Sequence, residues 1–439
     1  MVRGRIVYTL VALMAALPPK CGMAISAPLP AARLPVARVA TNTVAILADA
    51  ASRHLFVLSS GPTLPTQDPA GPGTLAALDL STGTTALSLA VGLAPVALAV
   101  DPVTDHLLTI DAGVAGRADG DGRLLDARTG APLRVLILPG TPKAVAALPG
   151  GRFLVACAGV GEEDPSTLVL IDARTGGLLH SWAGGIGPRA IGVDRRTGRA
   201  WVANAGPPPG SPAWRGHDLA SVSILDPVRG ARTLPIPQPP PPPVASGTPI
   251  FPLGASQLVI DEPRRRVFVA ATDAEMANPP GEIVALDADS GRVLVRRTVD
   301  PLAAMALDTE GGRLVVTHPF LGSYSSPAPD SGAISLLDGA TLKGVESHPR
   351  GTPGAVAVDP TARRAYVLTG HFSRYQPTGP GDVLAIDLRS GRLVGDVQVC
   401  PLPSAIALVP APMHTFLICS GRSLSGTGPD LVYVLDRRN

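Results

Sequence analysis

Two histidines carry the side chains best suited to chemistry in this chain. His318 ends the run Arg313-Leu-Val-Val-Thr-His, and His371 comes directly after Arg364-Ala-Tyr-Val-Leu-Thr-Gly. Imidazole binds metal ions and serves as a general base near neutral pH. Because the two runs resemble each other, we expect both histidines at corresponding places in neighbouring repeats. They are therefore candidates for a metal or general-base site, and the alternative is that they are two ordinary loop histidines.

Other polar side chains follow similar apolar runs and are candidate ligand-binding residues. With His318 and His371, they are Asp273, His217, Tyr324, Arg374, Tyr375 and Arg422. No catalytic residue is assigned, and no metal is assigned beyond the two histidines. In contrast, His54, His106 and His414 precede such runs, so we expect them to be structural or solvated.

Familiar catalytic motifs are absent from the sequence. It contains no Gly-x-Ser-x-Gly, His-Glu-x-x-His, Cys-x-x-Cys, phosphate loop or dinucleotide fingerprint. The segment Asp119-Gly-Asp121-Gly resembles the start of a calcium loop but lacks the later ligands, so we interpret it as a turn.

The composition favours a turn-rich β protein. The 439 residues are 45% hydrophobic, enough to bury a core, and include 48 Gly and 48 Pro. Lys and Arg number 37 against 35 Asp and Glu, and aromatic residues make up only 3%. This balance argues against a nucleic-acid-binding surface, which needs clustered basic charge and stacking aromatics.

The first residues have the pattern of an export signal. Arg3 and Arg5 precede the apolar run 6–17, which is too short to cross a bilayer as a helix. We expect residues 1–27 to be a signal peptide, with cleavage after Ala24 or Ala27. Lipidation at Cys21 and an uncleaved anchor are the alternatives. The mature chain is then secreted or extracytoplasmic, in the periplasm or at the cell surface, and has no transmembrane span.

Removal of the signal leaves three cysteines, Cys157, Cys400 and Cys419. Cys157 and Cys419 occupy matching places in two repeats, which normally lie far apart, so that pair should not form a disulfide. We expect all three to be small buried apolar side chains.

A repeat of about 50 residues dominates the sequence. Its marker is an Asp followed four residues later by Gly, as in Asp126-Ala-Arg-Thr-Gly130 and Asp172-Ala-Arg-Thr-Gly176. Asp338 heads a degenerate copy with Leu342 in the Gly place. The Asp carboxylate can accept backbone N–H bonds in a tight turn, and Gly supplies the positive φ at its end. We therefore interpret the repeated Asp as structural.

Each repeat holds four short β-branched runs separated by turn residues, which predicts four strands. Four-stranded units at this period indicate an all-β β-propeller, since a lone sheet cannot bury both faces. Eight blades are favoured, with seven as the alternative. The last repeat lacks a fourth strand, which residues 34–40 can supply to close the ring. Residues 28–439 then form a single domain with Pro-rich insertions at about 205–220 and 235–252.

The run Ala200-Trp-Val-Ala-Asn204, followed by Val222-Ser-Ile-Leu-Asp226, resembles the YVTN-type propeller repeat. The resemblance covers roughly residues 34–439. It is carried by the Asp-x-x-Thr/Ser-Gly turn, whereas the Asn of the motif is clear only at Asn204. It implies an exported propeller, with lactonase-like, quinoprotein-like and surface-layer proteins among related folds.

Two functions remain open at this point. The loops between second and third strands are long and share one face, called here the long-loop face, with the connections between blades; the opposite face is called the tight-turn face. The favoured hypothesis is a binding or scaffold module, acting as a monomer without a cofactor, whose protein or small-molecule ligand is held on the long-loop face. The alternative is a lactonase-like or quinoprotein-like enzyme with a metal or cofactor at the channel mouth.

Overall fold

The computed structural model shows that every regular element of the described residues is a β-strand. The described residues are 37–62, 69–113, 119–161, 163–207, 220–236, 253–273, 281–319, 322–323, 326–327, 332–373, 376–377, 379–400, 402–409, 414–419 and 429–436. None of them forms a helix with the length and hydropathy that crossing a bilayer requires. The predicted signal peptide and most of both Pro-rich insertions lie outside the described residues.

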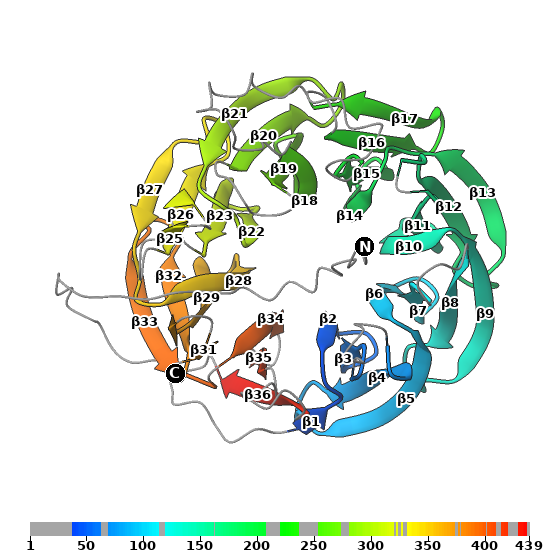
Figure 1. Ribbon diagram of the computed structural model, residues 1–439, viewed down its shortest axis with the longest axis horizontal. Coiled ribbons are helices and arrows are strands. Elements are labelled where there is room, and N and C mark those ends of the chain that lie inside the picture. The colour runs from blue at the N-terminus through cyan, green and yellow to red at the C-terminus, as the bar shows by residue number, and fades with distance from the viewer. Residues whose placement is uncertain are drawn as a thin grey trace, which may run out of the picture.

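Thirty-two of the strands form eight sheets of four, arranged in a ring (Figure 1). The first four sheets, written from the inner to the outer strand, are β2 (Thr43–Asp49), β3 (His54–Ser59), β4 (Pro72–Asp79), β5 (Thr85–Leu93); β6 (Pro95–Asp101), β7 (His106–Asp111), β8 (Asp119–Asp126), β9 (Pro132–Pro139); β10 (Thr141–Leu148), β11 (Arg152–Ala158), β12 (Thr167–Asp172), β13 (Leu178–Ala183); and β14 (Pro188–Asp194), β15 (Arg199–Asn204), β16 (Ser221–Asp226), β17 (Gly230–Pro235).

The other four sheets are β18 (Leu253–Asp261), β19 (Arg266–Asp273), β20 (Gly281–Asp287), β21 (Val293–Val299); β22 (Ala304–Asp308), β23 (Arg313–His318), β26 (Ala333–Asp338), β27 (Gly344–Ser347); β28 (Thr352–Asp359), β29 (Arg364–Gly370), β32 (Asp382–Asp387), β33 (Leu393–Gln398); and β34 (Pro403–Val409), β35 (His414–Cys419), β36 (Asp430–Asp436), β1 (Ala37–Val39). Two short hairpins, β24 (Gly322–Ser323) with β25 (Ser326–Pro327) and β30 (Phe372–Ser373) with β31 (Gln376–Pro377), occur in the second-to-third-strand loops of blades six and seven. The protein is thus an eight-bladed β-propeller, and the seven-bladed alternative is wrong.

The eighth blade combines both ends of the described chain (Figure 1). Its outer strand is β1, which pairs antiparallel with β36 through Ala37 opposite Val432 and Val39 opposite Asp430. The Asp430 carboxylate also accepts a 2.8 Å bond from the backbone N–H of Thr43 on β2. Blades eight and one are therefore joined by a side-chain bond as well as by the chain itself.

The hydrophobic core lies between the blades rather than within them. On β3, Leu55 and Val57 pack with residues of blade eight, whereas Phe56 and Leu58 pack with residues of blade two. Successive side chains of a strand point to opposite faces of its sheet, so each second strand serves two seams. The described core residues form one cluster for each of the eight seams, which is the burial that a single sheet cannot achieve.

The repeated Asp has the structural role expected from the sequence. Asp126 Oδ1 accepts the backbone N–H groups of Arg128 at 3.0 Å and Thr129 at 2.7 Å, and Gly130 has φ +73°. The bond from Thr129 is the main cause that holds the pKa of Asp126 below its usual value. In the degenerate repeat, Leu342 adopts φ +53° and is fully buried, so packing supports a conformation that Gly would adopt freely.

The first residue of the second strand links each of several blades to its neighbour on the tight-turn face. His54 Nδ1 lies 3.2 Å from the carbonyl oxygen of Ala127, and His106 Nδ1 lies 2.7 Å from that of Ala173. Arg266 donates in the same way to Gly339. The interpretation of His54 and His106 as structural is therefore confirmed; the side chain of His414 lies outside the description.

Two sequence interpretations are wrong. Cys400 and Cys419 form a disulfide, with their Cα atoms 6.0 Å apart, while Cys157 is buried and unpaired as expected. Matching repeat positions excluded the pair Cys157–Cys419, but Cys400 precedes the inner strand of the same blade that holds Cys419. Asp119-Gly-Asp121-Gly is not a turn but the start of β8, because it pairs with both neighbouring strands.

Candidate functional site

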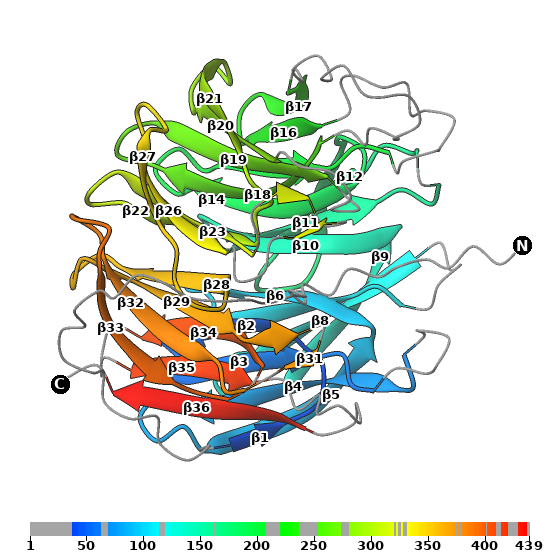
Figure 2. The same ribbon diagram turned by 60° about the vertical axis from the view of Figure 1, so that its left-hand side comes forward.

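The candidate site is the long-loop face, where the second strands end (Figure 2). Most of the side chains predicted for it cannot be placed. His217, Tyr324, Arg374, Tyr375 and Arg422 lie outside the described residues. Asp273 ends β19, and its side chain is also outside the description. The geometry of the face therefore rests on the strand ends and on the blade junctions, by which we mean the segments between one blade's outer strand and the next blade's inner strand.

His318 is a buried structural side chain. Its Nδ1 lies 3.2 Å from the carbonyl oxygen of Asp300 and 3.3 Å from that of Pro301, both in the junction between blades five and six. Its Nε2 lies 2.9 Å from Ser335 Oγ on β26. Carbonyl oxygens only accept, so Nδ1 carries a proton. In the neutral ring Nε2 accepts from the Ser335 hydroxyl, whose other acceptor, Glu346 Oε1, lies farther away at 3.4 Å. Burial lowers the pKa of His318 and keeps the ring neutral.

His371 occupies a more open position in blade seven. Its Nε2 lies 2.8 Å from Asp382 Oδ2, at the start of β32, and 28% of its side chain is exposed. The ring also faces the preceding junction, between blades six and seven, because a Cβ placed on Gly351 would lie 2.9 Å from its Cε1. A carboxylate that holds one imidazole nitrogen fixes the orientation of the ring. Of the two predicted histidines, His371 alone keeps solvent access.

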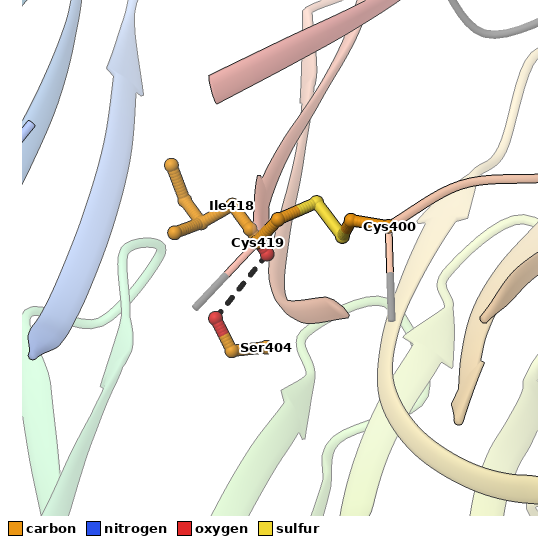
Figure 3. The surroundings of a disulfide bond; sticks show 4 residues. All are labelled: Cys400, Ser404, Ile418 and Cys419. Carbon is orange, nitrogen blue, oxygen red and sulfur yellow. Dashed lines mark hydrogen bonds between the residues drawn. A yellow bond between two sulfur atoms is a disulfide. The ribbon is translucent and has the colours of Figure 1, made fainter. Parts of the chain in front are cut away.

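The last residue of the second strand ties several junctions to their blades, each by different chemistry. In blade four, Asn204 Nδ2 donates to Ser223 Oγ, which accepts the N–H of Gly185 in the junction. In blade eight the equivalent residue is Cys419, bonded to Cys400 of the junction (Figure 3). His318 holds the corresponding place in blade six. In these blades the junction on the long-loop face is therefore bonded to the end of the second strand.

Asp111 holds this place in blade two, and sequence reasoning missed it as a functional candidate. Its side chain is fully buried, and neither carboxylate oxygen makes a hydrogen bond of normal geometry with the described residues. Arg123 Nε on β8 stays 4.0 Å from Oδ2, and Asp121 stands opposite Asp111 in the strand register. Burial, assisted by the charge of Asp121, raises the pKa of Asp111 to about 7, and the charge of Arg123 and the backbone N–H of Gly92 offset only part of the rise. Aligning the ends of the second strands would have drawn attention to it, because Asn204 and His318 occupy the same place.

Within the described part of the chain, no three His, Cys, Asp or Glu side chains gather where a metal ion could sit. His318 bonds to the junction between blades five and six and to Ser335 of blade six, whereas His371 bonds to Asp382 of blade seven.

No protein-family model matches the chain, and no curated protein matches it. Solved structures do match. Sqt1 from Saccharomyces cerevisiae is 10% identical with a TM-score of 0.61, over 94% of this chain and 100% of that one. BamB from Moraxella catarrhalis is 12% identical with a TM-score of 0.52, over 90% of this chain and 99% of that one. Quinohemoprotein alcohol dehydrogenase from Comamonas testosteroni is 12% identical with a TM-score of 0.56, over 94% and 77%. At such identities the likeness shows the propeller fold alone.

Proposed function

We propose that this protein is an exported β-propeller of the YVTN type that binds a protein or small-molecule ligand on its long-loop face. The observation that carries the proposal is the fastening of that face. Cys419, His318 and Asn204 each fix a blade junction from beneath, by a disulfide or by buried hydrogen bonds. Loops held on a rigid frame lose less conformational entropy on binding, which favours affinity.

The disulfide supports the exported part of the proposal. Disulfides persist in oxidising compartments and are rare in the reducing cytosol. The Cys400–Cys419 bond therefore agrees with the signal-like residues at the start of the sequence. Complete oxidation of this pair in protein recovered from the extracytoplasmic fraction, measured by thiol labelling after denaturation, is the expected result.

A photo-crosslinking experiment tests the binding face. A photoreactive amino acid replaces His371 on the long-loop face in one variant. In the matched control it replaces Arg128, which is 63% exposed on the tight-turn face. After illumination in the extracytoplasmic fraction, adducts are identified by mass spectrometry. Saturable adducts from position 371 and none from position 128 are expected. Adducts formed only from position 128 would place the binding surface on the tight-turn face and contradict the proposal.

An enzyme is the second candidate, favoured by one observation. The Asp382 carboxylate holds the partly exposed His371 imidazole at 2.8 Å, as an orienting acid holds a general base. Solved propellers of this shape include a quinohemoprotein dehydrogenase as well as BamB, so the fold does not decide between the two. The test compares lactone hydrolysis by wild type, His371→Ala and Asp382→Asn. Equal rates of lactone hydrolysis in all three proteins, together with a preparation that contains no metal, contradict the hypothesis of a lactonase-like enzyme.

A further inference from the structure

Beside the junction between blades one and two lies a buried ionisable side chain that is poorly supplied with donors. A Cβ placed on Gly92, near the end of β5, would lie 2.5 Å from Asp111 Cγ, so the carboxyl group of Asp111 rests directly against the end of this strand, next to the junction residue Ala94. Both carboxylate oxygens are buried and make no hydrogen bond of normal geometry with the described residues, and the nearby backbone N–H of Gly92 offsets only part of the cost of burial. An ionised carboxylate in this place is strongly disfavoured, whereas a protonated one is tolerated.

The same junction contains a residue in an uncommon backbone conformation. Ala94 adopts φ +50°, a conformation that is uncommon for residues other than Gly. Two backbone bonds fasten the junction to the end of β7: Ala112 N–H to the Ala94 carbonyl at 2.9 Å, and Gly113 N–H to the Leu93 carbonyl at 3.0 Å. Strain that is held by a small number of bonds can be released when one neighbouring group changes its charge.

Among the described residues, the charged groups that act on Asp111 both come from β8. Asp121 opposes the ionisation of Asp111 and Arg123 favours it. The end of β5, the junction and the start of β6 contribute Gly92, Leu93, Ala94 and Pro95, none of which titrates. Strand β10 approaches through Pro142, which packs against Gly120, and its Lys143 is not among the charges that shift the pKa of Asp111.

We propose that Asp111 is a proton-operated latch on the long-loop face. While the carboxyl group is protonated, it remains buried and the junction stays closed over it. When the proton leaves, the carboxylate seeks water or donors, the two backbone bonds from Ala112 and Gly113 open, and the edge of the face at blades one and two changes shape. The burial and packing of Asp111 carry this inference, which does not depend on the ligand proposed above.

Hydrogen exchange of the intact protein tests the latch. Exchange of a peptide covering residues 107–113 is followed by mass spectrometry from pH 5.5 to 8.5, corrected for the intrinsic effect of pH. In the wild type, protection is expected to fall by about tenfold or more across this range. In Asp111→Asn, which mimics the protonated form, protection should stay constant. The equivalent peptide of blade three, residues 153–158, has the thiol of Cys157 in this place and provides the internal control.

Two further variants keep the proposal falsifiable if Asp111→Asn fails to fold. Asp121→Asn removes the opposing charge, so the midpoint of the loss of protection should move to lower pH. Arg123→Gln removes the favouring charge, so the midpoint should move to higher pH. A midpoint that neither substitution moves, or a fall in protection that Asp111→Asn shares with the wild type, overturns the latch.

Discussion

The disulfide provides the clearest quantitative test of how the junctions hold the ring. Cys400 lies in the junction between blades seven and eight, and Cys419 ends β35, 19 residues further along the chain. Figure 3 shows the bond beside the Ser404 hydroxyl, which donates to the Ile418 carbonyl at 3.2 Å. The bond thus fixes the start of the last blade to the end of its second strand.

The size of its effect follows from the chain segment that it closes. A closed loop of about 20 residues removes about 11 cal/mol/K of entropy from the unfolded chain, or about 3 kcal/mol at 25 °C. Both half-cystines are buried, since Cys400 is 8% exposed and Cys419 is 1% exposed. We therefore expect the double variant Cys400→Ala/Cys419→Ala to lose about 3 kcal/mol of unfolding free energy, beyond a smaller loss from the removed sulfur atoms.

Urea unfolding, followed by far-ultraviolet circular dichroism, measures this loss. Wild type with and without reductant isolates the bond itself, because reduction leaves both side chains in place. Cys157→Ala is the matched control for a buried cysteine outside any disulfide. It should lose only the packing part and should not respond to reductant. If reduced wild type unfolds at the same urea concentration as oxidised wild type, the bond does not constrain the ring and the reasoning is wrong.

Three other perturbations test separate parts of the structure. Folding raises the pKa of Asp111 from 3.8 to about 7, so the folded protein binds a proton between these values and its stability falls as the pH rises through that window. The unfolding free energy of Asp111→Asn, measured in urea relative to that of the wild type, should therefore grow by up to about 3 kcal/mol from pH 5 to pH 9. A difference that stays constant with pH contradicts this prediction. His318→Ala should lose about 3 kcal/mol, because its partners in the junction and Ser335 are left unsatisfied, whereas retained stability would show that the ring does not need this contact. Asp430→Ala removes the acceptor of the Thr43 N–H at the last seam and should lower the melting temperature by a few degrees, which calorimetry measures; an unchanged melting temperature argues that β1 pairing alone is sufficient.

Features that repeat along the chain could be predicted because each is local. The Asp of each turn bonds to backbone groups two and three residues ahead, as Asp172 does with Arg174 and Thr175. Such a turn needs no distant partner, so its residues reveal it. The same regularity predicts four strands per repeat and the ring, since each repeat has apolar sheet faces that it can bury only against its neighbours.

Features that join a junction to a strand end could not be predicted in the same way. Repeat alignment compares residues at equal places, such as Cys157 with Cys419, but the partner of Cys419 is Cys400, which stands at a different place in the repeat. His318 looked like a possible ligand because its sequence neighbours are those of a strand end. The junction that covers it determines that both ring nitrogens bond within the protein.

The amino-acid sequence alone determined the repeated Asp turns and the four strands of each repeat, because these depend on interactions within a few residues, and it favoured eight blades over seven. The tertiary structure decided which strand ends are buried and which remain open, so that His318 is enclosed, His371 keeps access to solvent and the carboxyl group of Asp111 is buried against the end of β5. Those outcomes depend on how the junction of the preceding blade covers each strand end. That geometry arises only when the blades pack side by side.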